Sequence, residues 1–189
     1  MNIVLASGSP RRIELLKLIG IEDFLIIPDT SEERLTPRLS PEKQVCALSL
    51  QKAQNVARTC DRLDLIIAAD TIVYLDGEPL GKPDSHEDAR VMLTKLSGRM
   101  HSVYTGVTLV RDGKHISASE KTDVYFRELT ESEIKTYVET GEPMDKAGSY
   151  AAQGRAAVFV RRIEGDFFNV IGLPLYRLSM MLKEFNIQL

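Results

Sequence analysis

Two arginines stand at the start of a predicted helix near the N-terminus, in the run Ser7-Gly8-Ser9-Pro10-Arg11-Arg12. An apolar run that predicts a strand precedes them. Ser9 suits the N-cap, where its hydroxyl could accept from a backbone N–H, and Pro10 suits the first helical position. A helix N-terminus carries partial positive charge, so each cation there costs a few tenths to about 1 kcal/mol. An anion bound in the turn would offset that cost. We therefore predict a phosphate site, the alternative being a solvated helix start.

A lone carboxylate, Asp70, lies inside the apolar run Leu65–Leu75, with Thr71 as its polar neighbour. A carboxylate in such a setting is costly unless it is hydrogen-bonded, paired or bound to a metal. Asp70 is therefore a candidate metal ligand or general base at the edge of a cleft. Two alternatives remain open at this point: the strand emerges into solvent at Asp70, or the carboxylate holds a neighbouring loop through backbone hydrogen bonds.

Two lysines could complete a cationic cradle. Lys82 lies between two backbone-restricting residues in Gly81-Lys82-Pro83, and Lys52 lies on the inner half of a predicted helix. Together with Arg11 and Arg12 they would supply the charge to hold a triphosphate, whose oxygens favour arginine forks and lysine point charges. Each lysine alone is more typical of a solvated surface.

A second carboxylate for a metal could come from Glu32 or Glu33, in a polar loop that follows the second predicted strand. Mg²⁺ usually takes one or two carboxylates together with phosphate oxygens and water. The sequence lacks the P-loop, the dinucleotide fingerprint, the hydrolase elbow, the HExxH motif and the acidic Nudix helix. A phosphate site with Asp70 therefore favours direct, metal-assisted attack by water.

The overall composition restricts the class of protein. The 189 residues include 24 Lys+Arg and 27 Asp+Glu, a formal net charge of −3, which implies no general affinity for nucleic acid or for an anionic membrane. No apolar run approaches the roughly 20 residues that span a bilayer. Cys46 and Cys60 form no CxxC pair and show no zinc-ligand spacing with the histidines. We expect a cytoplasmic protein with reduced thiols and no secretory signal.

Alternating strand and helix signals predict one mixed α/β domain over residues 1–189, its helices covering a sheet that is partly parallel and partly antiparallel. Asp76-Gly77 and Asp112-Gly113 predict tight turns, and Thr130 with Glu133 predicts a capping box. The predicted strands are 2–6, 25–27, 65–75, 101–110, 116–126 and 156–163. The predicted helices are 10–19, 40–57, 86–96, 130–139 and a last one from Pro174.

Five ordered motifs resemble those of the Maf family, nucleoside triphosphate pyrophosphatases first associated with septum formation in bacteria. The resemblance runs from residue 2 to about residue 182 and is strongest to the members that act on dTTP and UTP. It implies an inosine triphosphatase-like α/β fold: an elongated mixed β-sheet flanked by helices, in two lobes with a central cleft. The motifs are Ser7-Gly8-Ser9-Pro10-Arg11-Arg12, Ala69-Asp70-Thr71, Lys82-Pro83, Asp145-Lys146-Ala147-Gly148 with Gln153-Gly154, and Asn169-Val170-Ile171-Gly172-Leu173-Pro174.

The resemblance also implies roles for individual residues. Asp70 matches the proton acceptor, and Glu33 with Asp70 matches the site of a divalent metal cation, Mg²⁺ or Mn²⁺. Substrate choice is associated with Arg12, Thr71 and Gln153. The phosphate cradle matches Ser7, Ser9, Arg11, Arg12, Lys52 and Lys82. The chain departs from its relatives at Tyr150-Ala151-Ala152-Gln153, where they carry glycine and a larger apolar residue, and this difference bears on the base pocket. Relatives also suggest a homodimer.

The expected reaction is hydrolysis of a nucleoside triphosphate to the monophosphate and pyrophosphate, with dTTP and UTP favoured, in nucleotide-pool control or septum formation. Two other functions stay open. Residues Leu5–Ser9 faintly resemble the glycine-rich loop of nucleotidyltransferases, which condense the nucleotide with a second substrate. A non-enzymatic nucleotide-binding regulator of cell division would bind the nucleotide and leave it intact.

Overall fold

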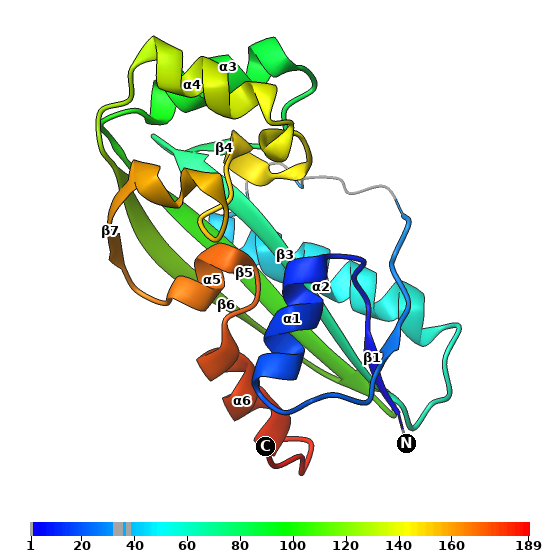
Figure 1. The fold of residues 1–189 in the computed structure, drawn as a ribbon. Coiled ribbons are helices and arrows are strands. Elements are labelled where there is room, and N and C mark those ends of the chain that lie inside the picture. Colours follow the sequence, from blue (N-terminus) through cyan, green and yellow to red (C-terminus); the bar gives the residue numbers. More distant parts are fainter. Residues whose placement is uncertain (1, 32–35, 37–38) are drawn as a thin grey trace. The chain divides into compact units, whose positions relative to one another are not determined.

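The computed structural model describes residues 2–31, 36 and 39–189 and confirms the mixed α/β class (Figure 1). The described strands form a seven-stranded sheet in the order β2-β1-β3-β5-β6-β7, and β4 pairs with β3. The strands are β1 (Ile3–Leu5), β2 (Leu25–Ile26), β3 (Leu65–Leu75), β4 (Glu78–Leu80), β5 (Met100–Arg111), β6 (Lys114–Phe126) and β7 (Val160–Glu164). The α-helices are α1 (Pro10–Leu18), α2 (Pro41–Ala57), α3 (His86–Leu96), α4 (Glu131–Glu139), α5 (Phe167–Ile171) and α6 (Leu175–Lys183). The 3₁₀-helices of the described residues are η1 (Glu142–Asp145), η2 (Ala147–Ser149) and η3 (Arg155–Phe159).

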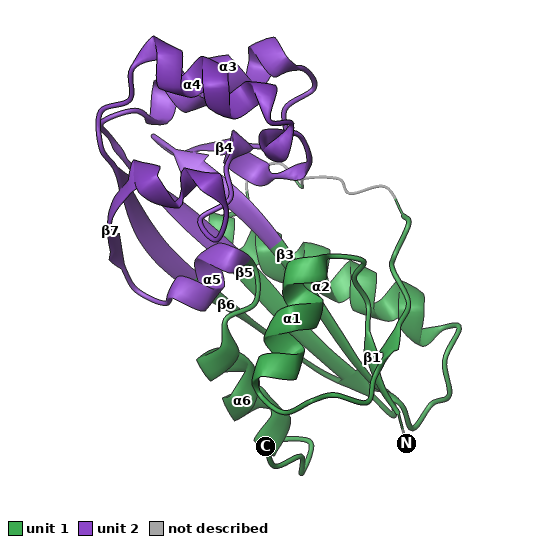
Figure 2. Ribbon diagram, in the orientation of Figure 1, with its two compact units in different colours: residues 1–70, 105–120, 172–189 green, residues 71–104, 121–171 purple. Residues whose placement is uncertain are grey.

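The chain folds into two compact units (Figure 2). Unit 1 comprises residues 1–70, 105–120 and 172–189, and unit 2 comprises residues 71–104 and 121–171. Among the described residues, no helix combines the length and the apolar character needed to cross a membrane.

Unit 1 is built around the parallel strands β2, β1 and β3. Its order follows from two crossovers: α1 connects β1 to β2, and α2 carries the chain back past β1 to β3. The first crossover runs from β1 to one side of the sheet, and the second runs past β1 to the other side. Because such crossovers are right-handed, α1 and α2 lie on opposite faces of these strands. Ala53 and Val56 of α2 pack with Val4, Ile66 and Ala68, so α2 covers the face formed by the even-numbered residues of β1 and β3.

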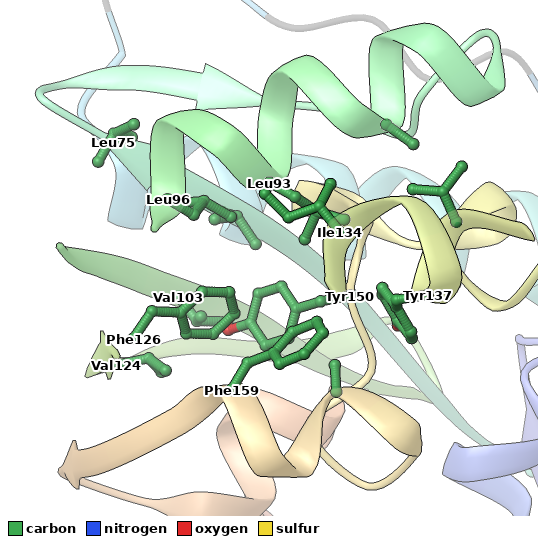
Figure 3. Packing of buried hydrophobic residues seen from close by; sticks show 14 residues of the cluster. Leu75, Leu93, Leu96, Val103, Val124, Phe126, Ile134, Tyr137, Tyr150 and Phe159 are labelled. Atoms are coloured by element: carbon green, nitrogen blue, oxygen red, sulfur yellow. The ribbon is translucent and has the colours of Figure 1, made fainter. Parts of the chain in front are cut away.

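Unit 2 has its own apolar core beneath α3 and α4 (Figure 3). Aromatic rings meet edge to face: Phe126 lies 4.9 Å from Tyr150, and Tyr137 lies 5.2 Å from Phe159, between ring centroids. His101 is 1% exposed in this core and bonds the Tyr150 hydroxyl through Nε2 at 2.8 Å. Burial lowers the pKa of His101 from 6.5 to about 4, so the ring is neutral at physiological pH.

Most predicted boundaries agree with the structure to within one or two residues, and the capping box of Thr130 and Glu133 is confirmed. The Asp76-Gly77 and Asp112-Gly113 pairs, with positive φ at all four residues, form the turns of the β3–β4 and β5–β6 connections. The strand predicted over 156–163 is wrong in its first half, because residues 155–159 form a 3₁₀-helix. Ala156 and Phe159 are buried there while Val158 is exposed, a spacing of three in place of strand alternation.

Candidate active site

The Ser7–Ser9 loop, which leads into α1, and Asp70 lie at the same end of the paired parallel strands β1 and β3 of unit 1. In the parallel pair β1–β3, Leu5 is the partner of Ile67, and the Ala6 N–H donates to the Ile67 carbonyl at 2.8 Å. Ser7 and Asp70 follow these partners at the carboxyl ends of the paired segments. The connections from β1 and β2 also diverge here, and open α/β sheets bind their ligands outside the carboxyl ends of strands at such a switch point.

Arg12 folds back over the loop that precedes its helix. Its Nε donates to the Gly172 carbonyl at 2.8 Å, and its Nη1 donates to the Ser7 hydroxyl at 3.2 Å. The Ser7 hydroxyl also accepts from the Ser9 N–H at 3.3 Å. Gly172 has φ +113°, a conformation that L side chains rarely adopt, and this backbone presents its carbonyl to Arg12. The guanidinium is therefore held beside the loop.

The predicted cap hydrogen bond of Ser9 is wrong. Ser9 is the N-cap of α1 with extended backbone, but within the described residues its side chain makes no cap hydrogen bond. The first turn of α1 contains Arg11 and Arg12 and no acidic side chain. Its first N–H groups have no partner inside the helix, as at any helix N-terminus. The physical reason for predicting an anion site at this turn therefore persists in the folded protein.

Asp70 is 4% exposed and pairs with Lys52. The Lys52 Nζ lies 2.5 Å from Asp70 Oδ1, and the two side chains are 13% and 6% exposed. Strand alternation puts Asp70 on the same face of β3 as Ile66 and Ala68, which is the face that α2 covers. Emergence of the strand into solvent at Asp70 is thus wrong. The ion pair offsets part of the cost of burying each charge.

The other predicted substrate residues belong to unit 2. Thr71 directly follows Asp70 and is partly buried, and Lys82 is exposed after β4. Gln153 is exposed in a turn that the Gly154 N–H closes by donating to the Ala151 carbonyl at 2.9 Å. The structure thus brings Ser7 to Arg12 and Lys52 to Asp70. The predicted metal ligand Glu33 and its neighbour Glu32 lie outside the described residues.

Two positions that the sequence interpretation left without a role prove structurally important. Gly172 supplies the carbonyl that Arg12 binds. Asn169, fully buried, donates through Nδ2 to the Val103 carbonyl at 3.0 Å and to Thr122 Oγ1 at 2.9 Å. The signal for Asn169 was present, because a polar side chain in an apolar run needs partners. Nothing local indicated the bond between Arg12 and Gly172.

The fold is similar to that of Ham1 proteins. A structure of the Staphylococcus aureus Ham1 protein matches with a TM-score of 0.53 at 16% identity, over 97% of this chain and 99% of that chain. The sequence comparisons then define the family. The model of the Maf-like proteins matches residues 2–185, and the chain belongs to the Maf family.

Similar proteins cover nearly the whole chain. A protein of Caldicellulosiruptor saccharolyticus named dTTP/UTP pyrophosphatase is 46% identical over 193 residues, covering 100% of this chain and 96% of that protein. A protein of Methanosarcina mazei with the same name is 47% identical over 188 residues, covering 98% of this chain and 95% of that protein. Such similarity along the whole length confirms the predicted family.

Proposed function

We propose that this chain is a nucleoside triphosphate pyrophosphatase that releases the nucleoside monophosphate and pyrophosphate, with dTTP and UTP favoured. The observation that carries the proposal is the buried Asp70 carboxylate at the same end of the paired strands as the Ser7–Ser9 loop that leads into the first turn of α1, with Arg11 and Arg12. Relatives that bear the name dTTP/UTP pyrophosphatase, at 46% and 47% identity over nearly the whole chain, support the substrate class.

Asp70 would accept the proton of a water molecule that attacks the α-phosphorus. The new bond joins the water oxygen to phosphorus, and the bond from phosphorus to the α–β bridging oxygen breaks. The electron pair leaves with pyrophosphate, and the proton moves to the Asp70 carboxylate. Lys52, 2.5 Å from that carboxylate, orients it and carries positive charge close to the reacting centre.

The phosphate cradle is the second part of the proposal. Ser7, Ser9 and the first-turn N–H groups of α1 would bind phosphate oxygens, with charge from Arg11, Arg12 and Lys82 stabilising the departing pyrophosphate. The contacts of Arg12 to Ser7 and Gly172 hold its guanidinium beside the loop before substrate arrives. A side chain that is already ordered loses less entropy when it binds.

A divalent cation, Mg²⁺ or Mn²⁺, fits these residues. Asp70 is a buried carboxylate, and its bond to Lys52 engages Oδ1. Mg²⁺ requires only one or two protein carboxylates when substrate phosphates supply further oxygens, so Asp70 would hold the ion together with Glu33. The described residues contain no cluster of three or more His, Cys, Asp and Glu side chains suited to a metal. A cation held there would supply positive charge to polarise the α-phosphate and the attacking water.

Base selection would rest on Gln153 and Thr71. The Gln153 amide can offer a carbonyl to the N3–H of thymine or uracil and an NH₂ to a ring carbonyl. Its exposure in a closed turn leaves both groups available for such contacts. A site that hydrogen-bonds a base edge rejects bases that leave its polar groups unpaired.

The test is product analysis with each common nucleoside triphosphate and Mg²⁺. We expect dTTP and UTP to be consumed well ahead of dATP and dGTP, yielding monophosphate and pyrophosphate. Gln153→Ala should shrink that preference more than it slows the best substrate, whereas Gln188→Ala, at an exposed glutamine near the C-terminus, should leave it unchanged. Intact nucleotide would identify a binding regulator, and pyrophosphate release only with a second substrate would identify a nucleotidyltransferase. Equal rates on all nucleotides, or diphosphate and orthophosphate as products, would contradict the proposal.

We also place the protein in the cytoplasm, as a homodimer, in nucleotide-pool control or septum formation. Cys46 and Cys60 are free thiols, which suits a reducing compartment. Sedimentation of the purified protein and fractionation of the cells that produce it test the oligomeric state and the location.

A further inference from the structure

The turn that carries Gln153 is anchored at both ends in the core of unit 2. Tyr150, on its N-terminal side, is 6% exposed and lies among the rings in Figure 3. Ala156, on its C-terminal side, is fully buried. Between them the backbone forms a single turn, closed by the bond from the Gly154 N–H to the Ala151 carbonyl at 2.9 Å. Gln153 therefore lies on a short turn whose two flanking residues, Tyr150 and Ala156, are both buried in the core.

The Glu142 carboxylate binds the C-terminal end of this turn through hydrogen bonds. The Arg155 N–H donates to both of its oxygens, at 3.3 Å and 3.0 Å. A Cβ added to Gly154 would lie 2.2 Å from Glu142 Oε1, so the carboxylate occupies the space that a side chain at position 154 would need. Glycine at position 154 is thus what allows the carboxylate to approach the turn.

Tyr137 of helix α4 binds the N-terminal end of the same turn. Its hydroxyl accepts from the Ala151 N–H at 3.2 Å, at the start of the turn. Burial, and after it a hydrogen bond with Glu142, raises the pKa of Tyr137. The phenol therefore stays protonated at neutral pH and can donate to the Glu142 carboxylate while it holds the Ala151 amide. One carboxylate and one phenol thus bind both ends of the Gln153 turn.

The same stretch of chain also contacts the loop of Lys82. The Gly148 N–H donates to the Gly81 carbonyl at 3.0 Å, directly before Lys82. The Lys146 Nζ donates to the Glu142 carbonyl at 2.8 Å, so the segment that reaches Gly81 is tied to the residue that holds the turn. Within unit 2, the segment from Glu142 to Gly148 therefore contacts both the Lys82 loop and the Gln153 turn.

We propose that Glu142 is a positioning residue for substrate selection, which sets the direction of Gln153 by holding the backbone of its turn. The proposal rests on the proposed function, in which Gln153 reads the base. Asp70 carries the chemical step in that function, so loss of Glu142 should weaken the preference among bases and raise KM for dTTP, with a smaller effect on kcat.

Three variants test this role. Glu142→Ala removes the carboxylate, and Gly154→Ala displaces it by placing a methyl group in its space. Glu139→Ala is the matched control, since Glu139 is an exposed carboxylate at the end of α4 whose contact is Lys135 at 4.0 Å. The readouts are kcat and KM for dTTP and dATP, and hydrogen exchange of the Arg155 amide without nucleotide. Circular dichroism checks that each variant is folded.

We expect both test variants to lower the ratio of dTTP to dATP kcat/KM by about tenfold, as for loss of a hydrogen bond to a charged group. Protection of the Arg155 amide should fall by about tenfold or more. Glu139→Ala should change neither quantity. Unchanged protection in folded Glu142→Ala would show that the carboxylate does not hold the turn. Lost protection with an unchanged preference would overturn the selection role. A wild-type protein inactive on every nucleotide would instead refute the proposed function, whatever the exchange data show.

Discussion

Replacing Asp70 by asparagine tests the proton-accepting role at nearly constant size. The amide oxygen can still accept from the Lys52 ammonium, but the side chain can no longer take a proton from water. Loss of a general base slows a reaction by about 10²-fold to 10⁴-fold, which corresponds to about 3 to 5 kcal/mol of activation free energy. We expect kcat for dTTP to fall by at least about 10²-fold on that basis.

Stability should also fall, because Lys52 and Asp70 are 13% and 6% exposed. Removing one partner of a buried ion pair costs about 3 to 5 kcal/mol, and the retained amide oxygen should reduce this to about 2 kcal/mol. The double variant Asp70→Asn/Lys52→Met removes both charges and should recover most of the free energy of unfolding. Urea unfolding of the two variants and the wild type measures these differences.

The control is Asp64→Asn, directly before β3. Asp64 is also buried, and its carboxylate accepts from the Asn2 N–H at 2.7 Å, a bond that lowers the Asp64 pKa. This variant should lose stability and keep kcat. Single-turnover rates are measured at a temperature where every variant is folded. Folded Asp70→Asn with kcat within about tenfold of the wild type would refute the reasoning, since even a modest general base contributes more than that.

Three further groups of variants test the phosphate cradle, the buried His101 and the N-cap of α4. Arg12→Ala and Lys82→Ala should each lower kcat/KM for dTTP by about tenfold to 100-fold in steady-state kinetics. Arg12→Ala should also lower the free energy of unfolding by about 1 kcal/mol, because it loses the hydrogen bond to the Gly172 carbonyl. Unchanged kinetics in both variants would show that the phosphate cradle lies elsewhere. His101 has a pKa of about 4 when folded against 6.5 for the free side chain, so as pH falls the unfolded chain binds its proton first. About 3 kcal/mol of the free energy of unfolding, present above pH 6.5, should therefore be lost between pH 6.5 and 4. His101→Gln should remove this pH dependence, which is measured by urea unfolding at a series of pH values. The same pH dependence in the wild type and in His101→Gln would contradict the burial argument. Thr130→Ala should lose about 1 kcal/mol in urea unfolding with its cap bond.

Local features of the sequence predicted most of the secondary structure. Val45, Leu48 and Val56 recur at helix spacing in the sequence and are buried on one side of α2, and the apolar run Leu65–Leu75 forms the buried strand β3. The Thr130 capping box and the Asp76-Gly77 turn depend on neighbouring backbone groups, so their residue types suffice to predict them. In η3, by contrast, the apolar pattern fits a strand and a helix equally well over five residues, and packing of Phe159 decided between them.

For the candidate site, the sequence by itself predicted the residues and the chemistry that we propose. The misplaced cations at Arg11 and Arg12 and the isolated carboxylate at Asp70 were visible because each conflicts with its local surroundings. These conflicts, with the ordered family motifs, were sufficient to predict a phosphate site and the Maf family. They required no knowledge of which residues come together in space.

Only the tertiary structure decided the partners of these groups. Lys52 is one of many lysines, and the packing of α2 on the even-numbered face of β3 brings its Nζ within 2.5 Å of Asp70. Arg12 bonds a carbonyl 160 positions further along the chain. Glu142 belongs to no motif identified from the sequence, yet it holds the Gln153 turn through backbone atoms. Nearly every residue has a backbone N–H and a carbonyl, so the residue type does not indicate which of these groups will form a hydrogen bond with a distant side chain. The tertiary fold decides which of them come within bonding distance.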